Sequence, residues 1–177
     1  ISQLSKTSVV YERVDLNGVL AEILKDFELL IDQKGCVIES HQLPIIEAIP
    51  VQMTQLFSNL ISNAIKFTRD GITLHLNIKC DVAGSSIQQK FPSLKPSTEY
   101  FVISFIDNGI GFEQSNADQI FDIFKRLHTR QEYEGTGMGL AMCKKIAENH
   151  GGHIYATSAP GEGATFTVIL PVTQSGT

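Results

Sequence analysis

The stretch YFVISFIDNGIGF, residues 100–112, joins an apolar run to a carboxylate and two closely spaced glycines. The apolar run predicts a central β-strand that ends at Asp107. Gly109 and Gly111 follow one residue apart, although a plain turn needs only one glycine. We therefore expect backbone kept free of side chains so that something can lie against it. An ordinary turn capped by Asp107 is the simpler alternative.

Patterns on either side of this stretch predict a two-layer α/β sandwich. Residues 72–78 alternate between apolar and polar side chains, which predicts a strand with one dry and one wet face. Helices are therefore expected on a single face of the sheet. Helical spacing of apolar residues predicts helices over about 16–33, with Asp15 as N-cap, and over about 50–67, opened by Pro50. Further elements are expected as a helix over about 137–149 and strands at CVIES (36–40), HIYATS (153–158) and GATFTVIL (163–170).

Three segments lack such a pattern. Residues 1–14 are polar and are expected to be a linker or the end of a preceding element. LPIIEAIP, residues 43–50, is expected to be an extended connection, and residues 81–99 a long polar loop. The domain itself is expected over residues 15–173, followed by a tail at 174–177.

The composition excludes several classes of protein. The chain has 177 residues, of which 42% are hydrophobic and 19% charged, as in one globular domain. A net charge of −5 argues against a nucleic-acid partner. No run of about 18 apolar residues predicts a membrane span, and the N-terminus has no secretory pattern. Three scattered cysteines indicate buried thiols in a reducing compartment, so a cytoplasmic location without direct membrane contact is expected.

A second glycine cluster, GTGMGLAMCKKI, places Gly135, Gly137 and Gly139 at the start of the third predicted helix. Helix N-termini carry unpaired N–H groups and partial positive charge, which favour phosphate. The spacing is not that of a Walker loop, and the cluster does not follow a strand in a βαβ unit, which disfavours a dinucleotide fold. A flexible hinge before a helix is the alternative.

A polar row runs along the helix predicted over 50–67. Asn59, Asn63 and Lys66 recur at i, i+4 and i+7, about 100° from the apolar stripe. Amide oxygens one turn apart suit Mg²⁺, which takes few protein ligands and shares phosphate oxygens. Lys66 could meet a phosphate as a point charge. A solvated helix face is the alternative.

Asp107 has the chemistry to recognise adenine. A carboxylate at a strand end can accept a hydrogen bond from the exocyclic amine of adenine, whereas guanine would present a carbonyl oxygen there. A charged hydrogen bond contributes roughly 1.5–3 kcal/mol. Its removal is therefore expected to cost about 10- to 100-fold in affinity.

Five stretches occur in the order of one known family: NLISNAIKFT (59–68), DNGIGF (107–112), IFDIFKRLH (120–128), GTGMGLAMCKKIAENHGG (135–152) and GEGATFTVILP (161–171). Over about residues 15–171 the chain resembles the ATP-binding catalytic domain of sensor histidine kinases, in the superfamily of gyrase, the Hsp90 chaperones and mismatch-repair ATPases. It is especially similar to the kinase modules of phytochrome-type and PAS-containing hybrid sensors. The resemblance implies a Bergerat-type α+β fold, with about three long helices on one face of a mixed, mostly antiparallel five-stranded sheet.

The resemblance implies ATP and Mg²⁺ as ligands and gives roles to the first two motifs. Asn63 would be the Mg²⁺ ligand, with Asn59 near the phosphates and Lys66 contacting them. Phe67 would pack on or beside the adenine ring, and Asp107 would bind its amine. The glycines of the DNGIGF motif, Gly109 and Gly111, would let the base in.

The later motifs would cover the triphosphate. Arg126 would approach the γ-phosphate from a mobile lid over about 113–134, anchored by Phe121 and Phe124. These phenylalanines are otherwise simply core residues of a short helix. Thr165 would offer a hydroxyl near adenine, or is an ordinary strand threonine. The phosphates would be wrapped by Gly135, Thr136, Gly137, Met138, Gly139 and Leu140.

The resemblance also favours phosphoryl transfer over hydrolysis. Hydrolysing members of the superfamily place a glutamate where this chain has Asn59, which is no base. Transfer needs mainly positioning and charge stabilisation, here by Asn59, Lys66 and Arg126. Alternatives are a regulatory ATP-binding module without kinase activity and an ATPase of the chaperone or topoisomerase type.

The phosphorylated histidine is expected on another domain, because none of the five histidines precedes an acidic residue. His75 and His150 are expected at the surface. The implied partners are a dimerisation domain of the same parent protein, which carries that histidine, and the receiver domain of a response regulator. The parent protein could be soluble or membrane-anchored.

Overall fold

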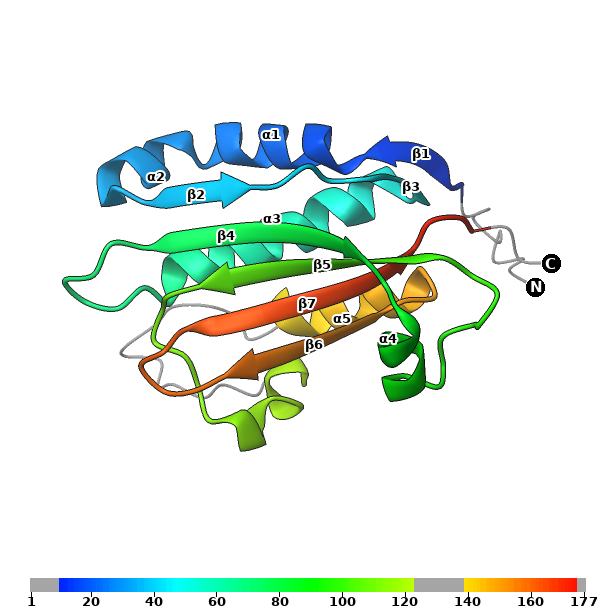
Figure 1. Cartoon of the computed structure of the whole chain (residues 1–177). Coiled ribbons are helices and arrows are strands. Elements are labelled where there is room, and N and C mark those ends of the chain that lie inside the picture. Colours follow the sequence, from blue (N-terminus) through cyan, green and yellow to red (C-terminus); the bar gives the residue numbers. More distant parts are fainter. Residues whose placement is uncertain (1–9, 123–138, 175–177) are drawn as a thin grey trace, which may run out of the picture.

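Helices cover one face of a five-stranded sheet, as the sequence predicts (Figure 1). The computed structural model of the chain describes residues 10–122 and 139–174. The strands of this sheet are β2 (Val37–Ser40), β4 (His75–Val82), β5 (Tyr100–Asp107), β7 (Ala164–Pro171) and β6 (His153–Ser158), in that spatial order. Only β2 and β4 are parallel, so the expected mixed, mostly antiparallel sheet is confirmed.

Three long helices pack together: α1 (Leu16–Asp26), α3 (Pro50–Lys66) and α5 (Gly139–Asn149). In Figure 1, α3 and α5 lie behind the sheet and α1 lies beside β2. α1 and α5 both pack against α3. The first predicted helix is in fact two, because the chain leaves the helical conformation at Phe27 before α2 (Glu28–Lys34) begins. Asp15 caps α1 as expected, since its Oδ1 accepts the Asn17 N–H at 2.9 Å. In the described part of the chain, no helix has both the length and the hydropathy to cross a membrane.

The middle helix, α3, carries the centre of the core. Its predicted apolar stripe is buried, and Phe57 meets Phe105 of β5 edge to face at 5.2 Å between ring centroids. The stripe fixes how α3 is rotated about its axis. It therefore also fixes where the polar row of the same helix lies. The buried residues of the predicted stripe are Met53, Leu56, Phe57, Leu60 and Ala64.

The strand predicted over 72–78 is shifted along the chain. Leu74 and Leu76 are buried as expected, but Ile72 is 44% exposed and β4 starts only at His75. Before that point the side chain of Asn108 replaces a neighbouring strand. Its Nδ2 donates to Thr73 O at 3.0 Å, and its Oδ1 accepts the His75 N–H at 2.8 Å.

A second, two-stranded sheet was not predicted. β1 (Glu12–Asp15) pairs antiparallel with β3 (Ile45–Ala48). β1 lies at the end of the segment expected to be a linker, and β3 lies in the expected extended connection. Each strand has only four residues, and β1 buries only Val14, so neither carries a strong period-two pattern.

Residues 81–99 are not the polar loop that the composition suggests. β4 continues to Val82, and the short helix α4 (Ser85–Lys90) follows. Leu94, Tyr100 and Ile169 form a small buried cluster on the sheet face opposite α3 and α5. The predicted wet face is therefore partly covered, near the end where β5 begins (Figure 1).

His150 was expected at the surface and is buried instead, with 1% of its surface exposed. Its Nδ1 lies 2.8 Å from Ile146 O, and its Nε2 lies 3.0 Å from the Ile49 N–H. A carbonyl only accepts and an N–H only donates, so the ring is neutral with its proton on Nδ1. Burial lowers the pKa of His150, an effect that the bond to Ile146 partly offsets. The ring thus joins the end of α5 to the start of α3.

This burial predicts a loss of stability in mild acid. In the unfolded chain His150 takes up a proton near pH 6.5, but in the folded chain it stays neutral to lower pH. Stability should therefore be fully present above pH 6.5 and fall below it, by up to about 1.4 kcal/mol per pH unit. Denaturant titrations between pH 8 and pH 5 measure this slope.

The variant His150→Gln removes the titrating group and should flatten the pH profile, although it should also lower stability at pH 7.5. His41→Gln, at an exposed histidine, is the matched control and should keep the wild-type slope. An unchanged slope in His150→Gln would contradict the prediction.

Candidate functional site

Among the described residues, several of the predicted site residues lie at one end of the sheet. β5 ends there at Asp107, β7 begins beside it at Ala164, and β6 ends next to Ala164 at Ser158. The C-terminal end of α3 and the N-terminal end of α5 lie behind the same end of the sheet (Figure 1). The end of α3 and the start of β7, about a hundred residues apart in the sequence, thus lie at the same end of the fold.

Asp107 is held at the centre of this end of the sheet. Its Oδ1 accepts the N–H of Gly109 at 2.8 Å and the N–H of Ala164 at 3.2 Å. Burial raises the pKa of Asp107 above its usual value, and these two donors act in the opposite direction. Both bonds go to one oxygen, so among the described residues Oδ2 is the carboxylate oxygen left for a ligand.

The two glycines after Asp107 are needed for packing within the protein. A Cβ on Gly109 would lie 2.5 Å from Phe67 O. Gly111 has φ = 67°, and a Cβ there would collide with Ala159 O. The expected bare backbone is present, but backbone of this same chain lies against it. The expected role of these glycines in admitting a base stays a prediction.

The end of α3 is fastened to the loop that follows Asp107. The Ile110 N–H donates to Phe67 O at 2.9 Å, and Arg69 Nε donates to Asn108 O at 2.9 Å. The backbone of Phe67 therefore lies directly beside the Asp107 loop, where its ring was expected to contact adenine.

The first residue of the polar row of α3, Asn59, lies against the start of α5. Asn59 and Asn63 are half-buried, Lys66 is exposed, and Asn59 Nδ2 lies 3.3 Å from Gly139 O. Amide oxygens of this kind fit a cation that takes few protein ligands. Within residues 10–122 and 139–174, no cluster of three or more His, Cys, Asp or Glu could bind a metal alone.

Cys143 of α5 is not a reactive thiol. It is buried with its Sγ 3.9 Å from Leu56 O, and burial raises its pKa to about 12. The expectation of buried thiols is thus met by Cys143 but not by Cys36 and Cys80, which are free and only half-buried.

Thr165 lies on the wrong face of the sheet for its expected role. Asp107 pairs with Ala164, and successive residues of a strand point to opposite faces. Thr165 therefore projects from the face opposite α3, beside Ile106 and Thr157. The glycine-rich turn before β7 left the strand register open to a shift of one residue, so we remove Thr165 from the site.

The lid predicted over 113–134 is described only to Asp122. This part forms two short 3₁₀ turns, Gln114–Asn116 and Gln119–Phe121. Phe121 is buried edge-on against Phe166, as a core residue would be. Of the other predicted site residues, Gly139 and Leu140 open α5. The following lie outside the described residues: Phe124, Arg126, Gly135, Thr136, Gly137 and Met138.

Ser158 and Gly163 belong to the site but were not predicted. The signal that could have found them is the sequence SAPGEG, residues 158–163, a turn signature directly before a strand. The side-chain contacts of Ser158 could not be read from that signature.

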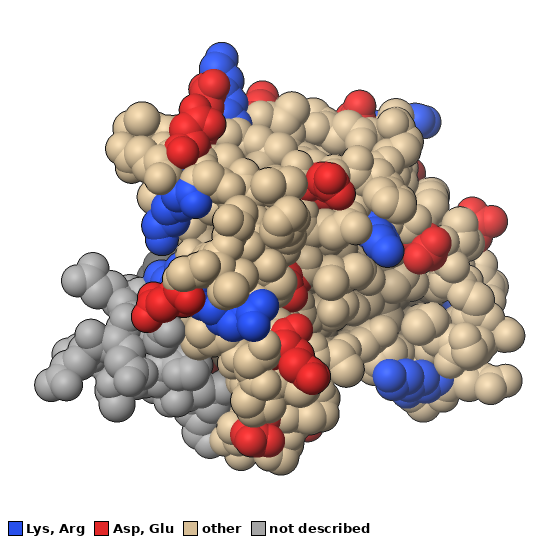
Figure 2. All heavy atoms as spheres, turned by 60° about the vertical axis from the view of Figure 1, so that its left-hand side comes forward, with Lys and Arg blue, Asp and Glu red and all other residues tan. Residues whose placement is uncertain are grey.

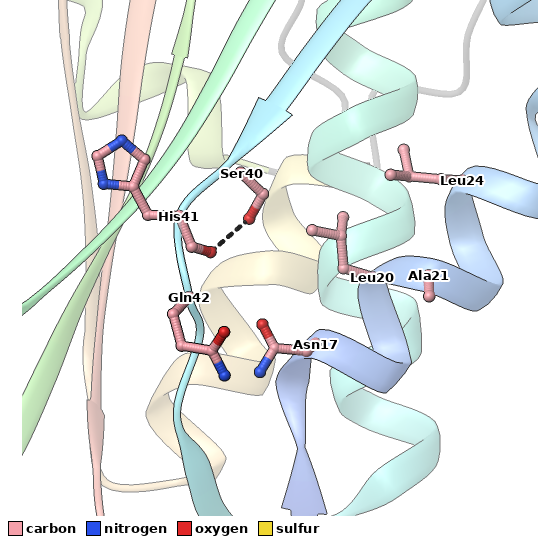
Figure 3. Close-up of a pocket in the computed structure, with 7 residues that line it drawn as sticks. All are labelled: Asn17, Leu20, Ala21, Leu24, Ser40, His41 and Gln42. Atoms are coloured by element: carbon pink, nitrogen blue, oxygen red, sulfur yellow. Dashed lines mark hydrogen bonds between the residues drawn. The ribbon is translucent and has the colours of Figure 1, made fainter.

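A shallow pocket elsewhere shares no residue with this site (Figure 3). It lies between α1 and the chain after β2, where Ser40 Oγ donates to His41 O at 2.8 Å. On the face shown in Figure 2, acidic and basic side chains of the described residues are interspersed without a basic stripe. The pocket is lined by Asn17, Leu20, Ala21, Leu24, Ser40, His41 and Gln42.

A family model described as "Histidine kinase-, DNA gyrase B-, and HSP90-like ATPase" matches residues 48–174. The phytochrome-like protein Cph1 of Synechocystis sp. is 39% identical over 162 residues, which are 89% of this chain and 19% of Cph1. The chain therefore spans about a fifth of the length of that relative.

Solved structures share the fold. The catalytic domain of histidine kinase ThkA has a TM-score of 0.71 at 25% identity, with 93% of this chain and 97% of that chain covered. ThkA in complex with the response regulator protein TrrA has a TM-score of 0.69 at 22% identity, with 94% of this chain and 43% of that chain covered.

The packing at Gly111 predicts a large effect of one methyl group. Gly111→Ala should destabilise the chain by about 3 kcal/mol or more, because the left-handed backbone alone costs about 1–2 kcal/mol and the collision with Ala159 O adds to it. Gly71→Ala is the matched control, since Gly71 has φ = 73° and open space around it. It should cost only about 1–2 kcal/mol in denaturant unfolding. Equal losses in the two variants would contradict the packing role.

Proposed function

The chain belongs to the histidine kinase-, DNA gyrase B- and HSP90-like ATPase family and is the ATP-binding catalytic module of a histidine kinase, and we propose that it transfers the γ-phosphoryl group of ATP to a histidine on a separate domain. The parent protein is a longer sensor kinase of a two-component system.

One observation carries this proposal, namely the way in which Asp107 is held. Oδ1 is bound by two backbone N–H groups, which orient the carboxylate and keep Oδ2 for a ligand. Oδ2 accepts a hydrogen bond from the exocyclic amine of adenine. Guanine is rejected because it would place a carbonyl oxygen against the carboxylate. This hydrogen bond is stronger at a partly buried carboxylate than it would be at an exposed one.

The triphosphate extends from adenine toward the space between α3 and α5. Asn63 would supply an amide oxygen to Mg²⁺. Asn59 of α3, whose Nδ2 lies 3.3 Å from Gly139 O at the start of α5, would lie beside the phosphates. Mg²⁺, when bound, would neutralise part of the phosphate charge. Lys66 and Arg126 add positive charge near the phosphates, and Gly139 and Leu140 present the helix N-terminus. A chain with a net charge of −5 needs such local groups to bind an anion.

The residues of this chain position the reactants and perform no proton transfer. An imidazole nitrogen of the acceptor histidine attacks the γ-phosphorus while the bond from that phosphorus to the ADP oxygen breaks, so the acceptor needs no base. The position one turn before Asn63 is Asn59, an amide that cannot activate water. This favours transfer over hydrolysis.

The acceptor histidine lies on a dimerisation domain of the parent protein, and the phosphoryl group passes on to the receiver domain of a response regulator. A complex of ThkA with its response regulator is known, which supports this class of partner. We place this domain in the cytoplasm, where ATP is available.

The adenine contact is tested by Asp107→Asn. The amide cannot serve as a charged acceptor, so the Kd for Mg-ATP should rise about 10- to 100-fold in calorimetry. Asp81→Asn, at an exposed carboxylate of β4, is the matched control and should bind like the wild type. No binding of adenine nucleotides by the unaltered chain would refute the proposal.

Phosphoryl transfer is tested by adding a purified dimerisation domain of a phytochrome-like kinase. Acid-labile phosphate should appear on its histidine only when this chain, Mg²⁺ and ATP are all present, and Asn63→Ala should lower the rate at least tenfold. This chain alone should not become phosphorylated. Steady phosphate release without transfer would instead indicate an ATPase, and binding without either reaction a regulatory module.

A further inference from the structure

Ser158 stands at the junction of the elements that hold Asp107. It is the last residue of β6 and pairs with Ala164, which in turn pairs with Asp107. The alternation of the strands puts its side chain on the helix-facing side of the sheet, the same side as Asp107. Ser158 is half-buried there.

The hydroxyl of Ser158 joins two loops through opposite hydrogen-bonding roles. It accepts the N–H of Phe112 at 2.9 Å and donates to Gly163 O at 2.6 Å. The first partner ends the loop that begins at Asp107, and the second ends the turn that connects β6 to β7. One oxygen thus fixes the spacing between the two loops.

The turn between β6 and β7 also positions the Ala164 N–H, the second hydrogen-bond donor to Asp107. Gly163 has φ = 83°, and a Cβ there would collide with Asp107 O, so the turn approaches the end of β5 as closely as backbone can. The next residue is Ala164, whose N–H binds Asp107 Oδ1. A shift of Gly163 therefore moves this donor directly.

A second bond holds the same two loops together without Ser158. The Gly161 N–H donates to Ile110 O at 2.6 Å. Because this bond is between backbone atoms, it survives substitution of Ser158. Loss of the hydroxyl should therefore loosen the Gly163–Ala164 end of the turn and leave the rest in place.

We propose that Ser158 is a positioning residue for nucleotide recognition, which aims the Asp107 carboxylate by fixing Gly163 and, through it, the Ala164 N–H. The inference rests on the proposed function of Asp107. It assigns Ser158 no contact with the nucleotide, only control of the orientation of the group that makes the contact.

The variant Ser158→Ala removes both bonds and leaves Phe112 N–H and Gly163 O without their partner. The Kd for ADP, measured by calorimetry on the 177-residue chain well below its melting temperature, should rise about tenfold. Ser158→Thr keeps a hydroxyl and should restore binding to within about threefold. Thr157→Ala, at the exposed neighbour on the opposite face, should leave binding unchanged.

A carboxyl titration by NMR separates positioning from plain stability. A weakened Ala164 donor stabilises the carboxylate less, so the pKa of Asp107 should be higher in Ser158→Ala than in the wild type and close to wild type in Ser158→Thr. If Ser158→Ala does not fold, Ser158→Cys takes its place, because a thiol is a weak donor and acceptor.

A lower melting temperature with unchanged Kd and unchanged Asp107 pKa would overturn the inference and leave Ser158 a structural role only. Failure of the wild-type chain to bind ADP would instead refute the proposed function. The two failures are therefore distinguishable.

Discussion

One carboxylate oxygen, Oδ1 of Asp107, is the point on which the site depends. Its two donors come from different elements, Gly109 in the loop after β5 and Ala164 at the start of β7. Half-burying a carboxylate is costly unless it is hydrogen-bonded, and two backbone N–H groups offset that cost. The same two bonds fix which way the other oxygen points. The contacts that stabilise this end of the sheet are thus the same ones that orient the oxygen to which we assign ligand selection.

In the rest of this end of the sheet, polar side chains form hydrogen bonds that a neighbouring strand would otherwise form. Asn108 bridges Thr73 and His75, and Gln114 bonds Ala156 O and the Ser158 N–H at the edge of β6. Each amide offers one donor and one acceptor, the pair that a neighbouring backbone would supply. The loops around Asp107 can therefore be irregular in shape and still well fixed.

Elements with a long, regular sequence pattern could be predicted, and elements with a weak pattern could not. The stripe of α3 and the apolar run of β5 are long and periodic, so they were predicted correctly, and Asp107 with its loop followed from them. Strands of four residues such as β1 carry too little pattern to be seen. His150 and Thr165 were misplaced because a burial partner and a one-residue register are properties of the folded chain and not of the local sequence.

The most direct test of the central claim is a crystal structure of the chain with a non-hydrolysable ATP analogue and Mg²⁺. We expect the exocyclic amine of adenine within hydrogen-bond distance of Asp107 Oδ2, with Oδ1 still bound to the N–H groups of Gly109 and Ala164. A nucleotide bound elsewhere, or one whose base turns its amine away from Asp107, would contradict it.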